Sequence, residues 1–405
     1  MRLTAMGKIV LLLMTVGVAV GGYRWWSQQS KGAGGSGRSF SLPGIKLPGS
    51  GQQGGKAGET LGDNDILFII TPAKKGWVQD QITRFNKEHQ GQWRIVTKQL
   101  PSREGMHAIL AGDVKPVLWS PGSQMWPTRL AEAWSEKHGT TLLDMSDPNA
   151  HRAFLRSPLV FLTTRQKAKF LRPLLGGREP WLALRRLSLG QQKTPWGSFR
   201  FSHADPLTSS SGLLTLGLIL FDYSQRTGQM GSLEKLSTDK RFLTYLSELE
   251  RGLVYDSPAQ EGTTKLAKAF IAEPSRYDVI TAYESAALEA APSHPDIAVI
   301  YPNPTAVSVH AVTLLNGDWV TPQQREGALE FVKFLGSPES LRGGLKEHFR
   351  PVQSSSALSL NSELSRHATQ GFQQSYSTTE LPPYEALNSA AYQWRIRIAK
   401  KPPTS

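Results

Sequence analysis

The sequence predicts an α/β protein with two lobes, and three observations lead to this fold class. Short apolar runs that suit strands alternate with amphipathic segments that suit helices along most of the chain. The first of these runs, Ile66–Ile70, is apolar throughout, as is typical of a strand buried on both faces of a parallel sheet. The chain has 405 residues, of which 39% are hydrophobic, and a chain of this length divides its core between two bodies.

Residues 1–26 have the features of an export signal or a membrane anchor. Arg2 and Lys8 precede an apolar run, Ile9–Tyr23, and basic residues at this place keep the start of the chain in the cytoplasm. The run is about fifteen residues long, shorter than the roughly twenty that span a bilayer comfortably, and signal peptides have this length. The pair Trp25-Trp26 resembles an interfacial belt and favours an uncleaved anchor, with a cleaved signal as the alternative.

The next segment, residues 27–64, is expected to be a flexible linker. It is rich in Gly, Ser, Gln and Lys and almost free of large apolar residues. Gly49–Gly54 spells G-x-G-x-x-G, but the dinucleotide-binding motif needs a strand before it and a helix after it, and this low-complexity segment predicts neither. We therefore expect the folded part to begin at Asp65.

The folded part is predicted to be a series of strands and helices. A strand is predicted where a short apolar run is bounded by turn residues. A helix is predicted where apolar residues recur about four positions apart, as at Trp126, Leu130 and Trp134. The predicted strands are Ile66–Ile70, Trp93–Val96, Val117–Trp119, Pro158–Leu162, Asp278–Ser285, Ile297–Tyr301 and Val309–Leu315. The predicted helices are Trp77–Phe85, Trp126–Trp134, the segment that begins near Gly212, Leu233–Leu253 and Gln323–Leu335.

A hydroxyl-rich loop, Asp205–Gly212, opens the apolar helix that includes Leu213–Leu220. The first turn of a helix has backbone N–H groups without internal partners, and the helix dipole makes this end positive. Serine and threonine hydroxyls add donors without adding charge, and Gly212 would let a ligand approach the backbone closely. The pattern predicts an anion or hydrogen-bonding site, and the alternative is an ordinary Ser/Thr helix cap. Loops at Thr71 and Ser120 also follow predicted strands, where α/β sheets bind their ligands.

Several short motifs occur in a characteristic order. They are the strand followed by Thr71-x-x-Lys74-x-x-Trp77, then Lys115–Pro121, Asp205-Pro206 with Ser209–Gly212, Asp278-Val279 with Tyr283–Ser285, Tyr301-Pro302, Asn316–Val320 and Phe349–Pro351. In this order the chain resembles the bacterial extracellular solute-binding proteins of the two-lobed, type II periplasmic-binding class. It is most similar to their molybdate/sulfate-binding-like branch, over residues 65–400.

The resemblance implies two α/β lobes joined by two crossing strands, with the ligand in the cleft between the lobes and closure by hinge rotation. The crossings are expected near Pro158–Leu162 and Val299–Val312. Lobe one is then expected to comprise residues 65–160 and 305–400, and lobe two residues 161–304.

The resemblance also implies which residues hold the ligand. From lobe one they are Thr71, Lys74, Ser120, Gly122 and Ser123, and from lobe two they are Ser209, Ser210, Ser211, Gly212, Thr263 and Tyr283. Glu284 follows Tyr283, and a carboxylate in the cleft repels an oxyanion unless a cation pairs with it. Two roles for Glu284 therefore stay open, one in the binding site and one in a hydrogen bond between the lobes or at the hinge.

The function implied by the resemblance is that of an exported or membrane-anchored periplasmic protein. It would capture a small polar solute, with an oxyanion favoured, as a monomer and for an ABC-type importer. The formal net charge of +13 favours anionic partners. A tethered sensor or adaptor of the same fold is an alternative. Another is a polyanion- or lipid-binding protein, because basic residues dominate Arg165–Arg200 and only Glu179 opposes them.

An enzyme, a metal site and a bound cofactor are not expected. The chain has no cysteine, no H-E-x-x-H and no G-x-S-x-G motif, so thiolate metal sites, helix-borne zinc sites and a nucleophile elbow lack support. His203 and Asp205 lie beside the serines, but a catalytic triad is recognised by its geometry and not by neighbouring positions. No recognised nucleic-acid module appears, and we expect no nucleic-acid partner.

Overall fold

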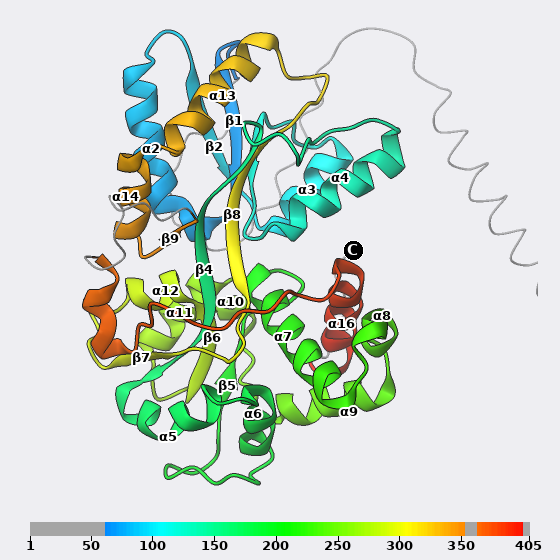
Figure 1. Ribbon diagram of the computed structural model, residues 1–405, viewed down its shortest axis with the longest axis vertical. Coiled ribbons are helices and arrows are strands. Elements are labelled where there is room, and N and C mark those ends of the chain that lie inside the picture. The colour runs from blue at the N-terminus through cyan, green and yellow to red at the C-terminus, as the bar shows by residue number, and fades with distance from the viewer. Residues whose placement is uncertain (1–60, 353–362, 400–405) are drawn as a thin grey trace, which may run out of the picture. The chain divides into compact units, whose positions relative to one another are not determined.

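The computed structural model describes residues 61–352 and 363–399 (Figure 1). The expected signal or anchor, residues 1–26, lies outside the described residues, as does all but the end of the expected linker, residues 27–64. Among the described helices, none combines the length and the apolar character that crossing a membrane requires. All described elements belong to the compact unit that begins at Leu61.

A mixed sheet forms the first half of the fold, and the mixture of strands and helices confirms the predicted α/β class. The strand order is β2-β1-β3-β8-β4, in which β1 is parallel to β2 and β3, and β8 is antiparallel to β3 and β4. The strands are β1 (Asp65–Ile70), β2 (Arg94–Gln99), β3 (Leu118–Ser120), β4 (His151–Thr164) and β8 (Val307–Leu314). Phe68 and Ile69 of β1 point to opposite faces and are both fully buried, so this part of the sheet is covered on both sides.

Helices follow these strands, as the alternating pattern predicts. They are η1 (Pro72–Lys74), α2 (Lys75–Glu88), α3 (Ser102–Ala111), α4 (Met125–His138), α13 (Pro322–Leu335) and α14 (Pro338–Lys346). The predicted helices Trp77–Phe85, Trp126–Trp134 and Gln323–Leu335 lie within α2, α4 and α13, whereas α3 is not among the predicted helices. α13 begins with a capping box between Thr321 and Gln324.

Two strands, β4 and β8, carry the chain between the two halves of the fold (Figure 1). β4 pairs along its first part with β8 and with β9 (Arg350–Pro351), and along its last part with β6 (Val279–Tyr283) and β7 (Ile297–Ile300). The expected crossing at Pro158–Leu162 lies within β4, and the expected return at Val299–Val312 includes the end of β7 and most of β8.

Helices surround the second part of the sheet, where the strand order continues from β4 to β6 and β5 (Phe201–Ser202). They are α5 (Arg165–Leu175), α6 (Pro180–Ser188), α7 (Ser210–Thr227), η2 (Met230–Ser232), α8 (Leu233–Leu236), α9 (Lys240–Leu249), η3 (Glu250–Gly252), α10 (Ser257–Gln260), α11 (Thr263–Ala272) and α12 (Glu284–Glu289). The basic segment Arg165–Arg200 contains α5 and α6 and is partly neutralised, since Lys167 pairs with Asp278 and Arg185 with Glu248.

Two predicted elements differ from the structure. The predicted helix Leu233–Leu253 is wrong, because α8, α9 and η3 divide this segment. The carboxylate of Asp239 accepts two backbone N–H groups of the following turn, and this cap starts a new helix. The predicted strand Asp278–Ser285 extends too far, because β6 ends at Tyr283 and α12 begins at Glu284.

The C-terminal part of the chain returns to the second half of the fold. After η4 (Ser365–Gln370), α16 (Tyr384–Arg397) packs against α7 and α8. Trp394 is fully buried, and Arg395 forms an ion pair with Asp205. These residues belong to the range 305–400 that is expected in lobe one. The lobe boundaries themselves stay a prediction.

Candidate functional site

A pocket of about 190 Å³ lies where loops and helix starts of the two halves of the fold meet. From the first half it is lined by Thr71, Pro72, Ala73, Pro101, Ser102 and Gly122. The second half contributes chiefly Thr208, Ser209, Ser210, Gly262, Thr263 and Tyr283. Most of these side chains are small or carry a hydroxyl, so the pocket offers hydrogen bonds without much charge.

Three helices begin at this pocket, and none of them has a side-chain cap. The N-cap residues are Pro101 for α3, Ser209 for α7 and Gly262 for α11, and no side chain at these positions accepts a hydrogen bond from the helix. Side chains do cap helices elsewhere, namely Thr164, Asp239, Thr321 and Ser337. Serine is a common capping residue, but the side chain of Ser209 does not cap α7. The first N–H groups of α7 therefore stay available. The three helix dipoles make this region favourable for negative charge.

Two buried hydroxyls at the pocket have no hydrogen-bond partner, those of Thr71 and Tyr283. Only 7% of Thr71 and 2% of Tyr283 are exposed. The hydroxyls of Ser210 and Ser308 lie near the Tyr283 hydroxyl and act to lower its pKa. Burial raises the pKa of Tyr283 well above its usual value, so this hydroxyl keeps its proton and can donate. Buried polar groups without partners are rare, and two of them at one pocket indicate a place for a polar ligand.

Ser210 joins the two halves of the fold beside the pocket. Its Oγ accepts a hydrogen bond from Trp126 Nε1 at 2.9 Å and donates to Ser102 Oγ at 3.1 Å. Ser102 Oγ in turn accepts the backbone N–H of Gly122 at 2.9 Å. A Cβ on Gly122 would lie 3.1 Å from Ser210 Oγ, so glycine permits this close approach. The structure therefore shows the two halves in direct contact at the site.

The structure brings half of the sequence-predicted site residues to the pocket. Those that line it are Thr71, Gly122, Ser209, Ser210, Thr263 and Tyr283. The others, which do not line it, are Lys74, Ser120, Ser123, Ser211, Gly212 and Glu284. The Ser211 hydroxyl is fully buried and bonds to that of Ser209 at 3.0 Å.

Gly212 has a packing role that the sequence did not indicate. A Cβ at this position would lie 2.0 Å from the carbonyl oxygen of Ala204. Glycine thus lets the first turn of α7 lie directly on the chain that follows β5. Gly212 therefore allows a close approach of the protein's own backbone, whereas the sequence predicted the approach of a ligand.

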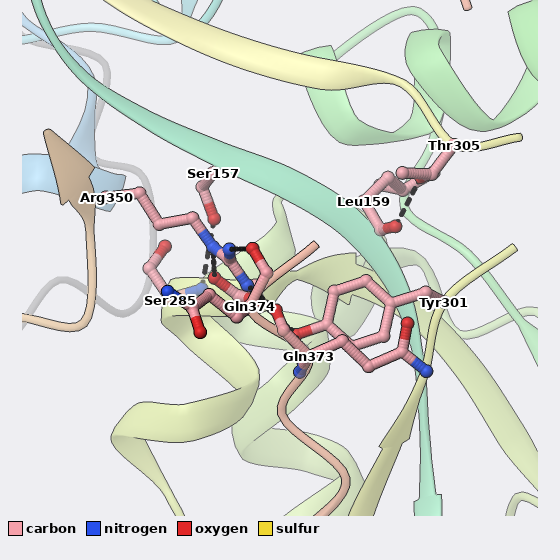
Figure 2. A network of polar contacts seen from close by, with 9 residues as sticks. Ser157, Leu159, Ser285, Tyr301, Thr305, Arg350, Gln373 and Gln374 are labelled. Carbon is pink, nitrogen blue, oxygen red and sulfur yellow. Dashed lines mark hydrogen bonds and ion pairs between the residues drawn. The ribbon is translucent and has the colours of Figure 1, made fainter. Parts of the chain in front are cut away.

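Glu284 does not line the pocket and forms a buried ion pair with Arg350. Figure 2 shows Arg350 with Tyr301, Gln373 and Gln374, which belong to the same network. Arg350 donates from Nε to one carboxylate oxygen at 2.7 Å and from Nη2 to the other at 2.6 Å, and Tyr301 donates its hydroxyl to the same carboxylate. Arg350 also donates to the carbonyl oxygens of Gln373 and Gln374. The pairing neutralises the Glu284 carboxylate and joins α12, β9 and the C-terminal segment.

Sequence reasoning missed Ser102, Trp126 and Arg350 as members of these networks. Pro101-Ser102 with Glu104 in the first turn is a helix-start signal that could have located α3. No local signal reveals that Arg350 reaches Glu284, because 66 positions separate them.

The described residues contain no group of three or more His, Cys, Asp or Glu side chains placed to hold a metal ion.

Comparisons with known proteins come from sequence and from structure. The family model described as bacterial extracellular solute-binding protein matches residues 66–342, well over half of the chain. A search of curated proteins gave no match. Similar solved structures include the sulfate-binding protein SubI from Mycobacterium tuberculosis H37Rv, with 15% identity, a TM-score of 0.54 and coverage of 78% of this chain and 94% of SubI.

Two further structures have a similar fold. Iron-bound HitA from Pseudomonas aeruginosa has 14% identity and a TM-score of 0.54, with 82% of this chain and 98% of HitA covered. The periplasmic binding protein AfuA from Actinobacillus pleuropneumoniae, with fructose-6-phosphate bound, has 14% identity and a TM-score of 0.53, with 83% and 98% covered. At these identities the likeness shows a shared fold. The three proteins are described with different ligands, namely sulfate, iron and fructose-6-phosphate.

Proposed function

Because the chain belongs to the family of bacterial extracellular solute-binding proteins, we propose that it captures a small oxyanion in the pocket at the starts of α3, α7 and α11. One observation carries this proposal: Thr71 and Tyr283, whose buried hydroxyls have no partner, line the same small pocket as three uncapped helix starts. Each of these groups can donate a hydrogen bond to an anion. The family name implies work outside the cytoplasm.

The charges around the pocket support an anion over a cation. The carboxylate among the lining residues is that of Glu261, and it is exposed and paired with Lys265. Glu284 is neutralised by Arg350. A volume of about 190 Å³ is below the range of roughly 300–1,000 Å³ that drug-sized ligands occupy, and it suits a compact ion. The printed name of SubI, a sulfate-binding protein of the same fold, supports the same ligand class.

The working cycle that we propose is capture followed by closure. β4 and β8 supply the hinge, and the bonds from Ser210 to Trp126 and Ser102 form when the halves meet. In this proposal the closed form delivers its solute to an ABC-type permease, and residues 1–26 hold the chain at the cytoplasmic membrane. The groups at the pocket bind and orient, and the proposal includes no catalytic step.

The first experiment is a thermal-shift screen of the protein against sulfate, molybdate, phosphate, neutral sugars and amino acids. A ligand present at a hundred times its dissociation constant adds about 2.7 kcal/mol to stability, which raises the melting temperature by several degrees. We expect the shift with an oxyanion. A shift with neutral solutes alone would contradict the proposed ligand class.

The second experiment tests the two unpartnered hydroxyls by titration calorimetry with the oxyanion that the screen identifies. Thr71→Val and Tyr283→Phe remove one hydroxyl each and keep the shape, so each should weaken binding about tenfold, equivalent to about 1.4 kcal/mol. The unfolding free energy should change little, because neither hydroxyl bonds within the protein.

Matched controls are Thr244→Val and Tyr392→Phe, at exposed positions away from the pocket. These controls should bind as the unchanged protein does. Equal affinity in all four variants would refute the proposed site.

A further inference from the structure

Lys74 is a buried lysine directly behind the wall of the pocket. Only 1% of it is exposed. Its Nζ donates to the carbonyl oxygen of Ser120 at 3.0 Å, to Ser120 Oγ at 2.7 Å and to the carbonyl oxygen of Pro121 at 2.7 Å. These three acceptors hold the amine against the loop that follows β3.

The three hydrogen bonds of Lys74 match the three N–H groups of an ammonium. Ser120 Oγ gives its own hydrogen to the carbonyl oxygen of Ala311 at 2.6 Å, so it must accept from Lys74. Three acceptors require three N–H groups, and only the ammonium has three. Burial holds the pKa of Lys74 well below its usual value, while the three acceptors stabilise the ammonium.

No carboxylate balances this charge. In the part of the chain that the structure describes, no acidic side chain lies within ion-pair distance of Nζ. The ionisable side chain that faces Lys74 from β8 is His310, and the carboxylate of Glu347 lies against Gly76 of α2. Burial first, and the charge of Lys74 second, lower the pKa of His310 well below its usual value, so the imidazole is neutral. When Lys74 is protonated, its charge therefore has no carboxylate partner among the described residues.

This charge lies close to the pocket without bordering it. Pro121 accepts from Nζ, and the next residue, Gly122, lines the pocket, as do Pro72 and Ala73 on the segment that carries Lys74. Standard bond lengths put Nζ within roughly 5 Å of the Gly122 nitrogen. At such distances inside a protein, a unit charge acts strongly on a second charge. The same bonds draw the carbonyl oxygens of Ser120 and Pro121 toward the amine.

We propose that Lys74 is the counter-charge of the pocket and makes it select anionic over neutral solutes without touching them. This inference rests on the proposed function and adds a residue to it. The ammonium also positions the 120–122 loop by holding two of its carbonyl oxygens. An anion in the pocket would complete the charge balance that the described side chains leave open.

The test compares Lys74→Met with Lys75→Met, which removes the neighbouring exposed lysine. Sulfate, molybdate and phosphate are titrated into each variant at constant ionic strength. We expect Lys74→Met to weaken anion binding at least about tenfold and Lys75→Met to change it less than about twofold, because exposed charges are screened. The affinity of the unchanged protein should fall as the pH rises through the lowered pKa of Lys74, and that of Lys74→Met should not.

The outcomes separate this inference from the proposed function. Equal sulfate affinity with and without Lys74, while Tyr283→Phe still weakens it, overturns the role of Lys74 and leaves the site in place. Binding of none of the three anions to the unchanged protein overturns the oxyanion proposal itself.

A second measurement needs no ligand and does not depend on the stability of the variant. The Nζ and Cε resonances of Lys74 can be followed by NMR in protein labelled at lysine, with Lys75→Met used to assign its neighbour. An ammonium at pH 7 that titrates below the range of ordinary lysines supports the inference. A neutral amine at pH 7 overturns it.

Discussion

At the scale of single residues, buried charges in this protein are held by short networks. His203 is an example away from the pocket: its Nδ1 lies 2.7 Å from the carbonyl oxygen of Ala204, and its Nε2 lies 2.9 Å from a carboxylate oxygen of Glu250. Both neighbours are acceptors, so both ring nitrogens must donate and the ring is an imidazolium. Burial acts to lower the pKa of His203, but the charge and hydrogen bond of Glu250 outweigh it, and the pKa lies above its usual 6.5.

This pair predicts a dependence of stability on pH. A group whose pKa is raised by folding stabilises the protein fully below its unfolded-state value and loses that effect as the pH rises through the folded-state value. The free energy of unfolding should therefore fall as the pH rises from 6.5 through the pKa of folded His203. Urea unfolding across this window measures the slope, which should be smaller in His203→Gln.

His138→Gln, at an exposed histidine, is the control and should keep the slope. Histidines whose pKa is lowered in the folded protein, such as His348, change the free energy of unfolding only below pH 6.5. They therefore do not affect the slope that is measured above this pH. An identical slope in His203→Gln would show that the imidazolium assignment is wrong.

At the scale of elements, α7 is the helix that the site depends on most. Its first half is buried all round, from Ser210 to Leu220. The position of Gly212 against the Ala204 carbonyl oxygen fixes the depth at which α7 begins, and so places Ser209 and Ser210 at the pocket. The helix start at the proposed site is thus positioned by packing of α7 against the chain that follows β5.

Gly212→Ala should therefore destabilise the fold and displace the site. A Cβ at 2.0 Å from a backbone oxygen forces the helix to shift, and overpacking of this kind costs about 1–3 kcal/mol. Urea unfolding gives this cost, and calorimetry should show weaker anion binding in the molecules that stay folded. Gly231→Ala is the matched control, because nothing lies within 4 Å of a Cβ there. Equal stability of the two variants would contradict the packing argument.

At the scale of the whole described fold, the C-terminal helix is a further connection between the two halves, besides β4, β8 and the contacts of Ser210. α16 packs against α7 and α8, and it also contacts α3, since Arg103 donates to the side-chain oxygen of Asn388 at 2.8 Å and to the Tyr384 hydroxyl at 3.3 Å. The ring of Tyr384 meets that of Trp126, the residue that donates to Ser210. In the proposed working cycle, opening of the pocket would break these contacts, so we expect them to favour the closed form.

Asn388→Ala should shift the population toward the open form. Loss of one hydrogen bond to a charged group is worth about 1.5–3 kcal/mol, so the apparent anion affinity should fall several-fold when closing is required for binding. Small-angle X-ray scattering without ligand should give a larger radius of gyration. Gln393→Ala, which removes a contact within α16 to Arg397, is the control. An unchanged radius and affinity in Asn388→Ala would show that α16 does not bias closure.

Much of the fold follows from local pattern. The core strands are continuous apolar runs, so Ile66–Ile70 and Pro158–Leu162 are predicted correctly within β1 and β4. The helix Leu233–Leu253 is predicted wrongly because a single capping side chain, Asp239, overrides the apolar pattern around it. Whether Trp25-Trp26 marks an anchor stays a prediction.

The sequence by itself determined the α/β class, the order of motifs and the loops that reach the pocket, because these depend on hydrophobic periodicity and on residues close in the chain. Tertiary structure decided which polar groups have partners within the protein and which line the pocket. Ser210 and Ser211 are neighbours with the same side chain, yet only Ser210 borders the pocket. Glu284 is paired with Arg350, and Lys74 is held by three uncharged acceptors. The physical reason is that the burial and the partners of a polar group are set by contacts between distant segments.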